Sequence, residues 1–372
     1  MNVRAICVGL CLFVVVLSVS TNAISNGVQS VSVSKSFFNP SLGDSVAISF
    51  VAAKAGNLSI QIIDRDGFLV RTLITETTTA KKVIVEWDGR NGGGHIVPDE
   101  AYSVRVILDD DIYFPADREQ PHFVLTSATY NKLTGLLAYD LPKSCRIHAQ
   151  AGVATIDPKT KEPNGPVMKT IVNREPRSSG RVLEHWNGMD ESGSIYVPDL
   201  KNFVVAVAAT ELPDTAIIAV GNKTESFLDS VANRTGKSLF THISSEHSHH
   251  QGLDSLNDSS PTMILQPSNA SWSSSNQAWI TGNDVLNIDG SVTGPSSPSF
   301  AQQPAKLLMF VDGNKVGEVS APSTPFALAL DTKNLETGDH IVSIDWASNY
   351  GPTSCNSFRL KLQRMGDAKE GK

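Results

Sequence analysis

Apolar and polar residues alternate along most of the first two hundred positions of the chain. LSIQIID (58–64) and AYSVRVIL (101–108) repeat with a period of two, the pattern of a strand with one buried face. Stretches rich in Gly, Asn and Asp, such as GRNGGG (89–94) and GMDESG (188–193), interrupt the alternation and predict turns. No helical period of ten or more residues precedes residue 222. The pattern predicts an all-β chain of β-sandwich domains.

The same pattern occurs twice. Trp87, Gly89 and Pro98 in EWDGRNGGGHIVPDEAYSVRV are repeated in EHWNGMDESGSIYVPDLKNFVVAV, at offsets of 99 to 100 residues. Thr72 is likewise repeated as Thr170, at an offset of 98. A period this long indicates a duplicated domain rather than a solenoid repeat. The repeated residues are expected to stabilise the domain, the tryptophans as core aromatics and Asp88 as the cap of its own turn. This structural motif comprises Trp87, Asp88, Gly89, Pro98, Trp186, Gly188 and Pro198.

The segment IIDRDGFLVRTL…EWDGRNGGGHIVPDEAYSVRV resembles the Ig-like domain of the flagellar hook-capping protein family and its secreted relatives. The resemblance covers about residues 28–109 and, more loosely, 124–221. Glu100 stands where the family usually has glycine, and Asn187 replaces the motif aspartate in the second copy. The resemblance implies that the sandwiches are Ig-like or fibronectin-like. It also implies a structural and binding module rather than a catalyst.

Strand patterns return after residue 260, with a hairpin signal at Asp312-Gly313-Asn314. FVDG…PFALALDTKNLETGDHIVSIDWASNYG resembles another bacterial Ig-like domain, of the kind appended to surface proteins and polysaccharide-active enzymes. Trp272 and Trp279 flank SSSNQA there. Trp272 is a candidate for stacking on a sugar ring, and Trp279 is expected to be a buried strand residue.

The N-terminal segment MNVRAICVGLCLFVVVLSVSTNA has one positive charge before a short apolar run and a small residue at Ala23, the order of a secretory signal peptide. The sequence therefore predicts export to the periplasm, the surface or the surroundings of a bacterium, with no transmembrane segment after cleavage. The expected layout is a signal peptide (1–23), Ig-like domains at 28–110, 124–221 and 262–364, a His-containing linker (222–261) and a polar tail (365–372).

Thirty-one basic and 38 acidic residues give a formal charge of −7, with no basic cluster that would indicate nucleic acid as a partner. Export leaves Cys145 and Cys355, too few for a disulfide-rich scaffold. The sequence contains no G-x-S-x-G elbow, no phosphate-binding loop and no nucleotide fingerprint. These observations predict a non-catalytic protein.

The stretch FTHISSEHSHHQGLD (240–254) lies in the long connection before the third domain. An extended chain places His247 and His249 on one side, and a helix aligns His242, Glu246 and His250. Such donors suit Zn²⁺ or Cu²⁺, although the spacing matches no fixed metalloenzyme signature. The stretch is thus open between a metal site, a polar linker and a pH-sensitive contact between domains.

The favoured function is an exported binding or assembly protein that recognises a protein or a cell-surface polysaccharide. Two alternatives stay open. One is an exported Cu- or Zn-binding protein that uses His242, Glu246, His247, His249 and His250. The other is an accessory part of a polysaccharide-active system.

Overall fold

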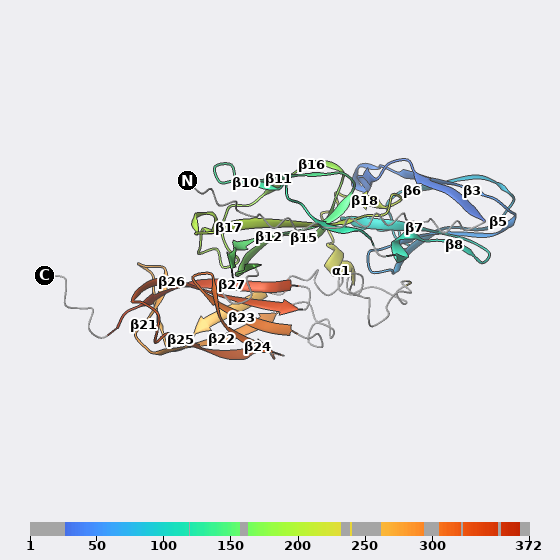
Figure 1. The fold of residues 1–372 in the computed structure, drawn as a ribbon. Coiled ribbons are helices and arrows are strands. Elements are labelled where there is room, and N and C mark those ends of the chain that lie inside the picture. Colours follow the sequence, from blue (N-terminus) through green and yellow to red (C-terminus); the bar gives the residue numbers. More distant parts are fainter. Residues whose placement is uncertain are drawn as a thin grey trace, which may run out of the picture.

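The computed structural model describes residues 27–118, 120–156, 163–231, 239, 262–293, 305–320, 323–348 and 351–364. These residues form β-sheets packed face to face, which confirms the all-β prediction (Figure 1). Within the described ranges, no helix is long and apolar enough to cross a membrane. The histidine stretch at 240–254 lies outside the described residues.

The first sandwich packs two sheets around an apolar core. One sheet has the order β1-β3-β6, and the other has the order β2-β18-β7-β4-β5 with β8 paired to β7. Phe38, Phe50 and Trp87 are among its largest buried side chains. The strands are β1 (Val28–Val33), β2 (Phe37–Phe38), β3 (Val46–Ala52), β4 (Gly56–Ile63), β5 (Leu69–Thr78), β6 (Lys81–Trp87), β7 (Glu100–Leu108), β8 (Asp111–Tyr113) and β18 (Ile217–Ala219), with 3₁₀ turns η1 (Pro40–Leu42) and η2 (Pro115–Asp117).

The second sandwich repeats this plan. Its sheets have the orders β10-β11-β16 and β15-β12-β17-β9, with a separate β13-β14 pair. Its elements are β9 (His122–Val124), β10 (Thr129–Asn131), β11 (Leu136–Leu141), β12 (Cys145–Val153), β13 (Thr155–Ile156), β14 (Pro163–Asn164), β15 (Val167–Arg177), β16 (Gly180–His185), η3 (Val197–Asp199) and β17 (Phe203–Glu211).

The two tryptophans occupy equivalent positions, as the duplication predicts. The Trp87 indole N–H donates to the Arg90 carbonyl at 3.0 Å, and the Trp186 indole N–H donates to the Met189 carbonyl at 2.9 Å. In each copy, the side chain after the tryptophan accepts a hydrogen bond from the backbone N–H two positions further on. Asp88 accepts from the Arg90 N–H, and Asn187 accepts from the Met189 N–H. Asn187 therefore replaces the motif aspartate without loss of the turn.

The glycine of each turn has a left-handed backbone, with φ 71° at Gly89 and 81° at Gly188. A Cβ on Gly89 would also lie 2.4 Å from Pro40 Cβ, and one on Gly188 would lie 2.2 Å from Tyr196. Both the conformation and the close packing require glycine. Trp87 and Trp186 are both buried, so each turn contributes its tryptophan to a core.

The chain returns to the first sandwich after completing the second. β18 pairs antiparallel with β7 and parallel with β2, and Ile217 and Ala219 belong to the first core. The expected second-domain boundary at residue 221 is therefore wrong. In the first sandwich β18 lies beside β7, and this position is equivalent to that of β9 beside β17 in the second. Because β18 follows the second sandwich in the chain but belongs to the first, the second sandwich is inserted into the first.

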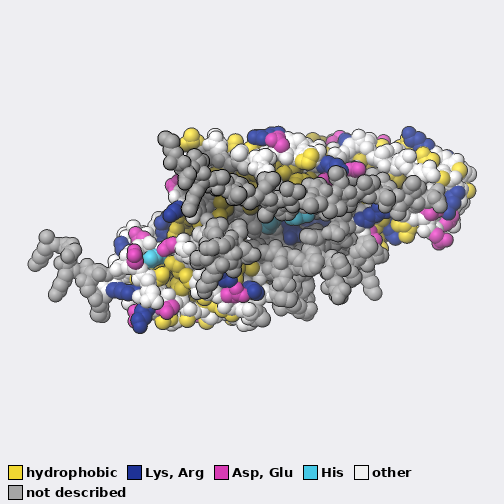
Figure 2. All heavy atoms as spheres, viewed as in Figure 1, with side chains coloured by type: hydrophobic (Ala, Val, Ile, Leu, Met, Phe, Trp, Pro, Cys, Tyr) yellow, Lys and Arg dark blue, Asp and Glu magenta, His cyan; other side chains and the backbone are white. Residues whose placement is uncertain are grey.

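The third sandwich lies alongside the second (Figure 1 and Figure 2). Its sheets have the orders β19-β22-β25 and β20-β21-β27-β26-β23-β24. The Asp312-Gly313 turn joins β23 to β24, as predicted. The strands are β19 (Thr262–Pro267), β20 (Ser271–Ser273), β21 (Ala278–Thr281), β22 (Val285–Thr293), β23 (Ala305–Val311), β24 (Asn314–Ser320), β25 (Phe326–Asp331), β26 (Gly338–Ser348) and β27 (Gly351–Leu362).

Replacement of Trp87 tests the structural role of the motif. Trp87 is fully buried and contacts Phe38 and Tyr102 with ring centroids 5.4 Å apart in both pairs. Trp87→Ala should lower the free energy of unfolding by about 3–5 kcal/mol, because it leaves a cavity in the core. Ile84→Ala, on the same strand but 61% exposed, is the control and should cost far less. Denaturant unfolding measures both, and wild-type stability for Trp87→Ala would contradict the structural role.

Candidate functional site

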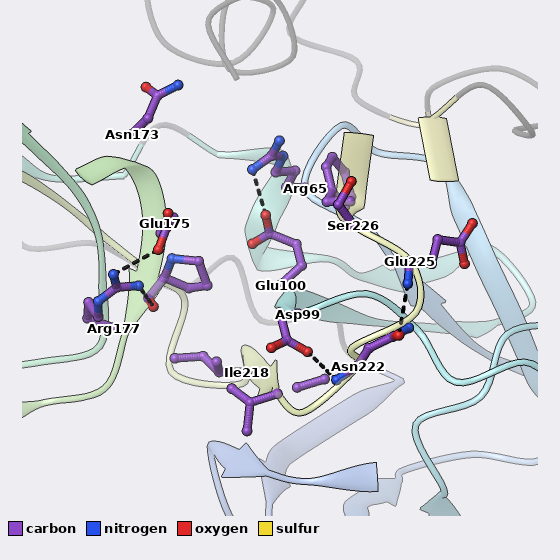
Figure 3. A pocket seen from close by; sticks show the side chains of 14 residues that line it. Arg65, Asp99, Glu100, Asn173, Glu175, Arg177, Ile218, Asn222, Glu225 and Ser226 are labelled. Carbon is purple, nitrogen blue, oxygen red and sulfur yellow. Dashed lines mark hydrogen bonds and ion pairs between the residues drawn. The ribbon is translucent and has the colours of Figure 1, made fainter. Parts of the chain in front are cut away.

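A cleft of about 540 Å³ opens where the first sandwich, the second sandwich and the segment after β18 meet (Figure 3). Its lining is mostly polar. The residues are Arg65, Asp99, Glu100, Asn173, Glu175, Pro176, Arg177, Ile218, Ala219, Val220, Asn222, Glu225, Ser226 and Phe227. We call it the junction cleft.

A buried carboxylate stands at the base of the junction cleft. Glu100 accepts a hydrogen bond from Arg65 at 2.6 Å and one from Arg146 at 2.7 Å, and its side chain is 2% exposed. The Ala101 backbone N–H also donates to it, at 2.5 Å. Arg65 follows β4 in the first sandwich, whereas Arg146 belongs to β12 in the second. Glu100 therefore joins the two sandwiches through opposite charges that are shielded from solvent.

A short helix covers the first-sandwich side of the cleft. α1 (Phe227–Val231) begins after Ser226, whose hydroxyl accepts from the Asp229 backbone N–H at 3.2 Å, while Asp229 accepts from the Ser226 N–H at 3.1 Å. This reciprocal pair is a capping box. The hydrogen bonds from the Ser226 hydroxyl and backbone lower the pKa of Asp229. The cap places the Phe227 ring 3.8 Å from the Arg65 guanidinium, a cation–π contact.

Asn222 attaches the chain between β18 and α1 to the first sandwich. Its backbone N–H donates to Asp99 at 2.7 Å, and its amide nitrogen donates to the Ile96 carbonyl at 3.0 Å. Its side-chain oxygen accepts from the backbone N–H groups of Thr224 and Glu225. The hydrogen bonds of Asp99 and Asn222 thus shape the cleft wall.

The opposite wall carries a second charged cluster. Arg177 binds Glu184 at 2.7 Å and Glu175 at 2.8 Å, and Glu184 also accepts from the Tyr139 hydroxyl at 3.0 Å. Burial opposes the charge of Arg177, but the bonds to the two glutamates outweigh it and raise the Arg177 pKa. Figure 3 shows Glu175 and Arg177 across the cleft from Arg65 and Glu100.

The junction cleft is suited to recognition by charge and hydrogen bonds. Four carboxylates and two guanidiniums line it, and most take part in bonds that hold the wall together. Among the described residues there is no group of three or more His, Cys, Asp or Glu side chains placed to hold a metal ion. Burial raises the pKa of the Cys145 thiol to about 11, so this cysteine is a poor nucleophile.

Of the predicted binding residues, the structure describes Trp272, which does not line this cleft. His242, Glu246, His247, His249 and His250 lie outside the described residues. Trp272, on β20, is 52% exposed, and its ring lies edge-on to Trp279 with centroids 5.5 Å apart. Trp279 lies on a strand, as expected, but it is only partly buried against the third core. Trp272 thus presents an accessible aromatic surface, and its binding to sugar stays a prediction.

Sequence reasoning missed Arg65, Arg146 and the role of Glu100. One signal was available, since Glu100 departs from the glycine usual at this position of the resembled domain. A glutamate at a position usually occupied by glycine requires a counter-charge. The sequence does not indicate that two arginines from different sandwiches provide it.

Comparison with known proteins identifies one part of the chain. Residues 39–111 match the FlgD Ig-like domain family, and this match agrees with the resemblance carried by the Trp87 turn. No curated protein matches the sequence.

Several solved structures align at low similarity. A tetra-tandem repeat from the extending region of a large adhesion protein is 12% identical, with 91% of this chain and 74% of that chain covered and a TM-score of 0.20. The BSP domain of a biofilm-associated protein is 8% identical, with 93% and 68% covered and a TM-score of 0.18. A β-glucuronidase from Ruminococcus gnavus is 7% identical, with 86% and 36% covered and a TM-score of 0.18. TM-scores this low establish no common arrangement.

Removal of the Glu100 charge should destabilise the junction. Glu100→Gln leaves Arg65 and Arg146 buried without their common counter-charge, which should cost about 3–5 kcal/mol of unfolding free energy. The control is Asp140→Asn, which breaks the exposed pair with Arg181 and should cost less than about 1 kcal/mol. Urea unfolding of the three proteins measures the difference. Equal stability of the two variants would show that the Glu100 contacts do not hold the junction.

Proposed function

We propose that the chain is an exported, non-catalytic binding or assembly protein whose tandem Ig-like sandwiches form a scaffold for recognition. In this proposal, the first unit comprises residues 27–118 with the returning strand β18, the second lies between them, and the third begins at residue 262. The observation that carries the proposal is the continuity of the first two sandwiches through β18 and Glu100. The FlgD Ig-like domain match at 39–111 supports a structural and binding module.

A rigid junction favours recognition. The cleft walls come from three segments that are fixed by hydrogen bonds and ion pairs before a partner arrives, so little ordering entropy is lost on binding. Glu175 and Glu225 line the cleft with their carboxylates and favour a partner that presents cationic or hydrogen-bond-donating groups. The partner class that fits best is a protein segment carrying Lys or Arg.

Export and recognition can be tested on one preparation. Cell fractionation with mass measurement of the N-terminus should find the chain outside the cytoplasm, beginning after Ala23. The labelled mature protein should bind intact cells or isolated envelope, and Glu175→Ala/Glu225→Ala should weaken that binding about tenfold or more. The exposed pair Asp284→Ala/Asp289→Ala on the third sandwich serves as the matched control. An uncleaved cytoplasmic chain, or equal binding by both variants, would contradict the proposal.

Polysaccharide recognition is a second candidate, favoured by the exposed ring of Trp272. Stacking on an aromatic face contributes through the C–H-rich surface of the sugar and tolerates variation in the hydroxyl groups. In the same envelope assay, loss of binding in Trp272→Ala with full binding by the cleft variant would identify this surface as the recognition site.

Metal binding by the histidine stretch stays a proposal with its own test. Calorimetry with Cu²⁺ and Zn²⁺ on the untagged mature protein should show specific binding that His247→Ala/His249→Ala weakens by about tenfold or more. An isolated peptide of residues 240–254 should bind more weakly than the protein, because the neighbouring sandwiches restrict its ends. Equal affinity of the double variant and the wild-type protein would reduce the stretch to a linker.

A further inference from the structure

The third sandwich turns one face of its larger sheet toward the rest of the molecule. Val342, Ile344 and Trp346 of β26 point into the third core, so Ser343 and Asp345 point to the opposite face. On that outer face, Ser343 and Asp345 are each only 1% exposed. An outer sheet face that is buried to this extent must be covered by another part of the protein.

The second sandwich provides that cover. The Val167 backbone N–H of β15 donates to Asp345 Oδ2 at 2.9 Å, and the Thr155 hydroxyl donates to the Gly313 carbonyl at 3.0 Å. Ile341 of β26 packs against the cluster that contains Met168 and Trp186. These contacts join the second and third sandwiches, and Figure 1 shows β27 and β26 lying below β12 and β15.

Asp345 is an unusual component of this contact. Val167 satisfies Oδ2, but Oδ1 is buried and has no hydrogen-bond partner among the described residues. Burial raises the pKa of Asp345 well above its ordinary value, and the bond from Val167 only partly opposes that rise. A buried carboxylate without a counter-charge is costly, whereas the protonated acid fits the site.

The surrounding groups do not offset that cost. The neighbouring β27 carries Cys355, whose thiol pKa is raised by burial and then by the nearby carboxylates of Asp345 and Glu191. Lys169 of β15 is the nearby cation, but it is already paired with Glu191 at 3.1 Å, and Asp190 adds a further negative charge to this side of the contact. These charges act on the Cys355 thiol, whereas the pKa of Asp345 is raised by burial and opposed only by the bond from Val167, so no cation among the described residues compensates an ionised Asp345.

A second titratable pair holds the turn at the same contact. His340 Nδ1 lies 2.7 Å from Asp312 Oδ2, and its Nε2 lies 2.8 Å from the Glu336 carbonyl. Burial disfavours charge on His340, but these two bonds outweigh it and raise the His340 pKa. Asp312 directly precedes Gly313, the residue that accepts from Thr155, so the His340–Asp312 pair positions part of the interface.

We propose that the contact between the second and third sandwiches is a proton-dependent joint, which closes when Asp345 carries a proton and loosens when Asp345 ionises. Protonated His340 reinforces the closed state by holding the Asp312 turn. This inference goes beyond the proposed recognition function and does not depend on it. It would let the protein change its shape with the acidity of its surroundings.

The direction of the pH dependence follows from the raised pKa values. The contribution of Asp345 is fully present below about 3.8, the pKa of the separated side chain, and is lost as pH rises through the higher value of the closed state. The contribution of His340 is fully present below 6.5 and is lost as pH rises through its raised value. Both groups therefore favour closure in acid.

The Cys355 thiol is a native probe of the joint. It is free, buried, and lies on the covered face beside Asp345, whereas Cys145 is free and buried within the second core. The mature protein is reacted with 4,4′-dithiodipyridine between pH 4 and 8, and peptide mass spectrometry quantifies each labelled cysteine. Each rate is divided by that of the same cysteine in urea-unfolded protein at the same pH, which removes the chemistry of the thiol itself.

The wild-type Cys355 rate should rise about tenfold or more over this range, since the loss of one coupled proton changes the opening constant by at most about tenfold per pH unit. The Cys145 rate should stay constant. Asp345→Asn should abolish most of the rise, and His340→Gln should reduce it above pH 6.5. Asp289→Asn, an exposed carboxylate on the other sheet of the same sandwich, should behave as wild type.

Three results would contradict the proposal of a proton-dependent joint. They are a wild-type Cys355 rate that does not change with pH, an unchanged pH dependence in Asp345→Asn, or a parallel rise at Cys145, which would indicate general unfolding. The pH dependence of the wild-type Cys355 rate tests the proposal even if Asp345→Asn folds poorly. Thr155→Val offers a further check, because the loss of its bond to Gly313 should raise the Cys355 rate at every pH without changing the slope.

Discussion

The buried charge of Glu100 is the constraint on which the arrangement of the first two sandwiches depends. A carboxylate that is 2% exposed needs counter-charges, and it takes one from each side of the junction, Arg65 and Arg146. Such a cluster adds little net stability compared with apolar packing, but it tolerates few alternative positions of its members. Its main effect is therefore to fix how the second sandwich sits on the first. The returning strand β18 reinforces this effect, because its backbone pairs with β7 only after the chain has passed through the second sandwich.

This arrangement would give a chain of Ig-like modules the defined recognition surface that we propose. In tandem modules joined by a single linker, the surface at each junction varies with the angle between them. Here two chain crossings and a buried ion cluster join the first pair, so the walls of the junction cleft stay in register. The contact with the third sandwich is of a different kind. It buries Asp345, and a charge on this side chain costs energy in the closed state. In our proposal, the stability of this contact therefore depends on pH.

Much of the fold could be predicted from the sequence because its determinants are local. The period of two in LSIQIID and AYSVRVIL specifies strands, and the Trp-x-Gly turns at Trp87 and Trp186 mark equivalent positions in the two copies. The sequence places β18 in the second domain because it follows that domain in the chain. Three apolar residues carry no signal for the sandwich that they join, and only the tertiary contacts with β7 and β2 assign the strand to the first sandwich. The cluster around Glu100 escaped prediction for the same reason, since Arg65 and Arg146 are 81 residues apart in the numbering and meet only when both sandwiches have formed. The histidine stretch lies outside the described residues, so the choice between a metal site, a polar linker and a pH-sensitive contact rests on the sequence alone.

Native-state hydrogen exchange tests most directly the claim that the first two sandwiches form one cooperative body. Amides of β7, β18 and β12 are followed at increasing denaturant, below the unfolding transition. If Glu100 and β18 unite the sandwiches, the slowest amides of all three strands should converge on a single free energy of opening. Amides of β12 that open at denaturant concentrations where β7 and β18 stay closed would show that the second sandwich unfolds independently, and would contradict the account.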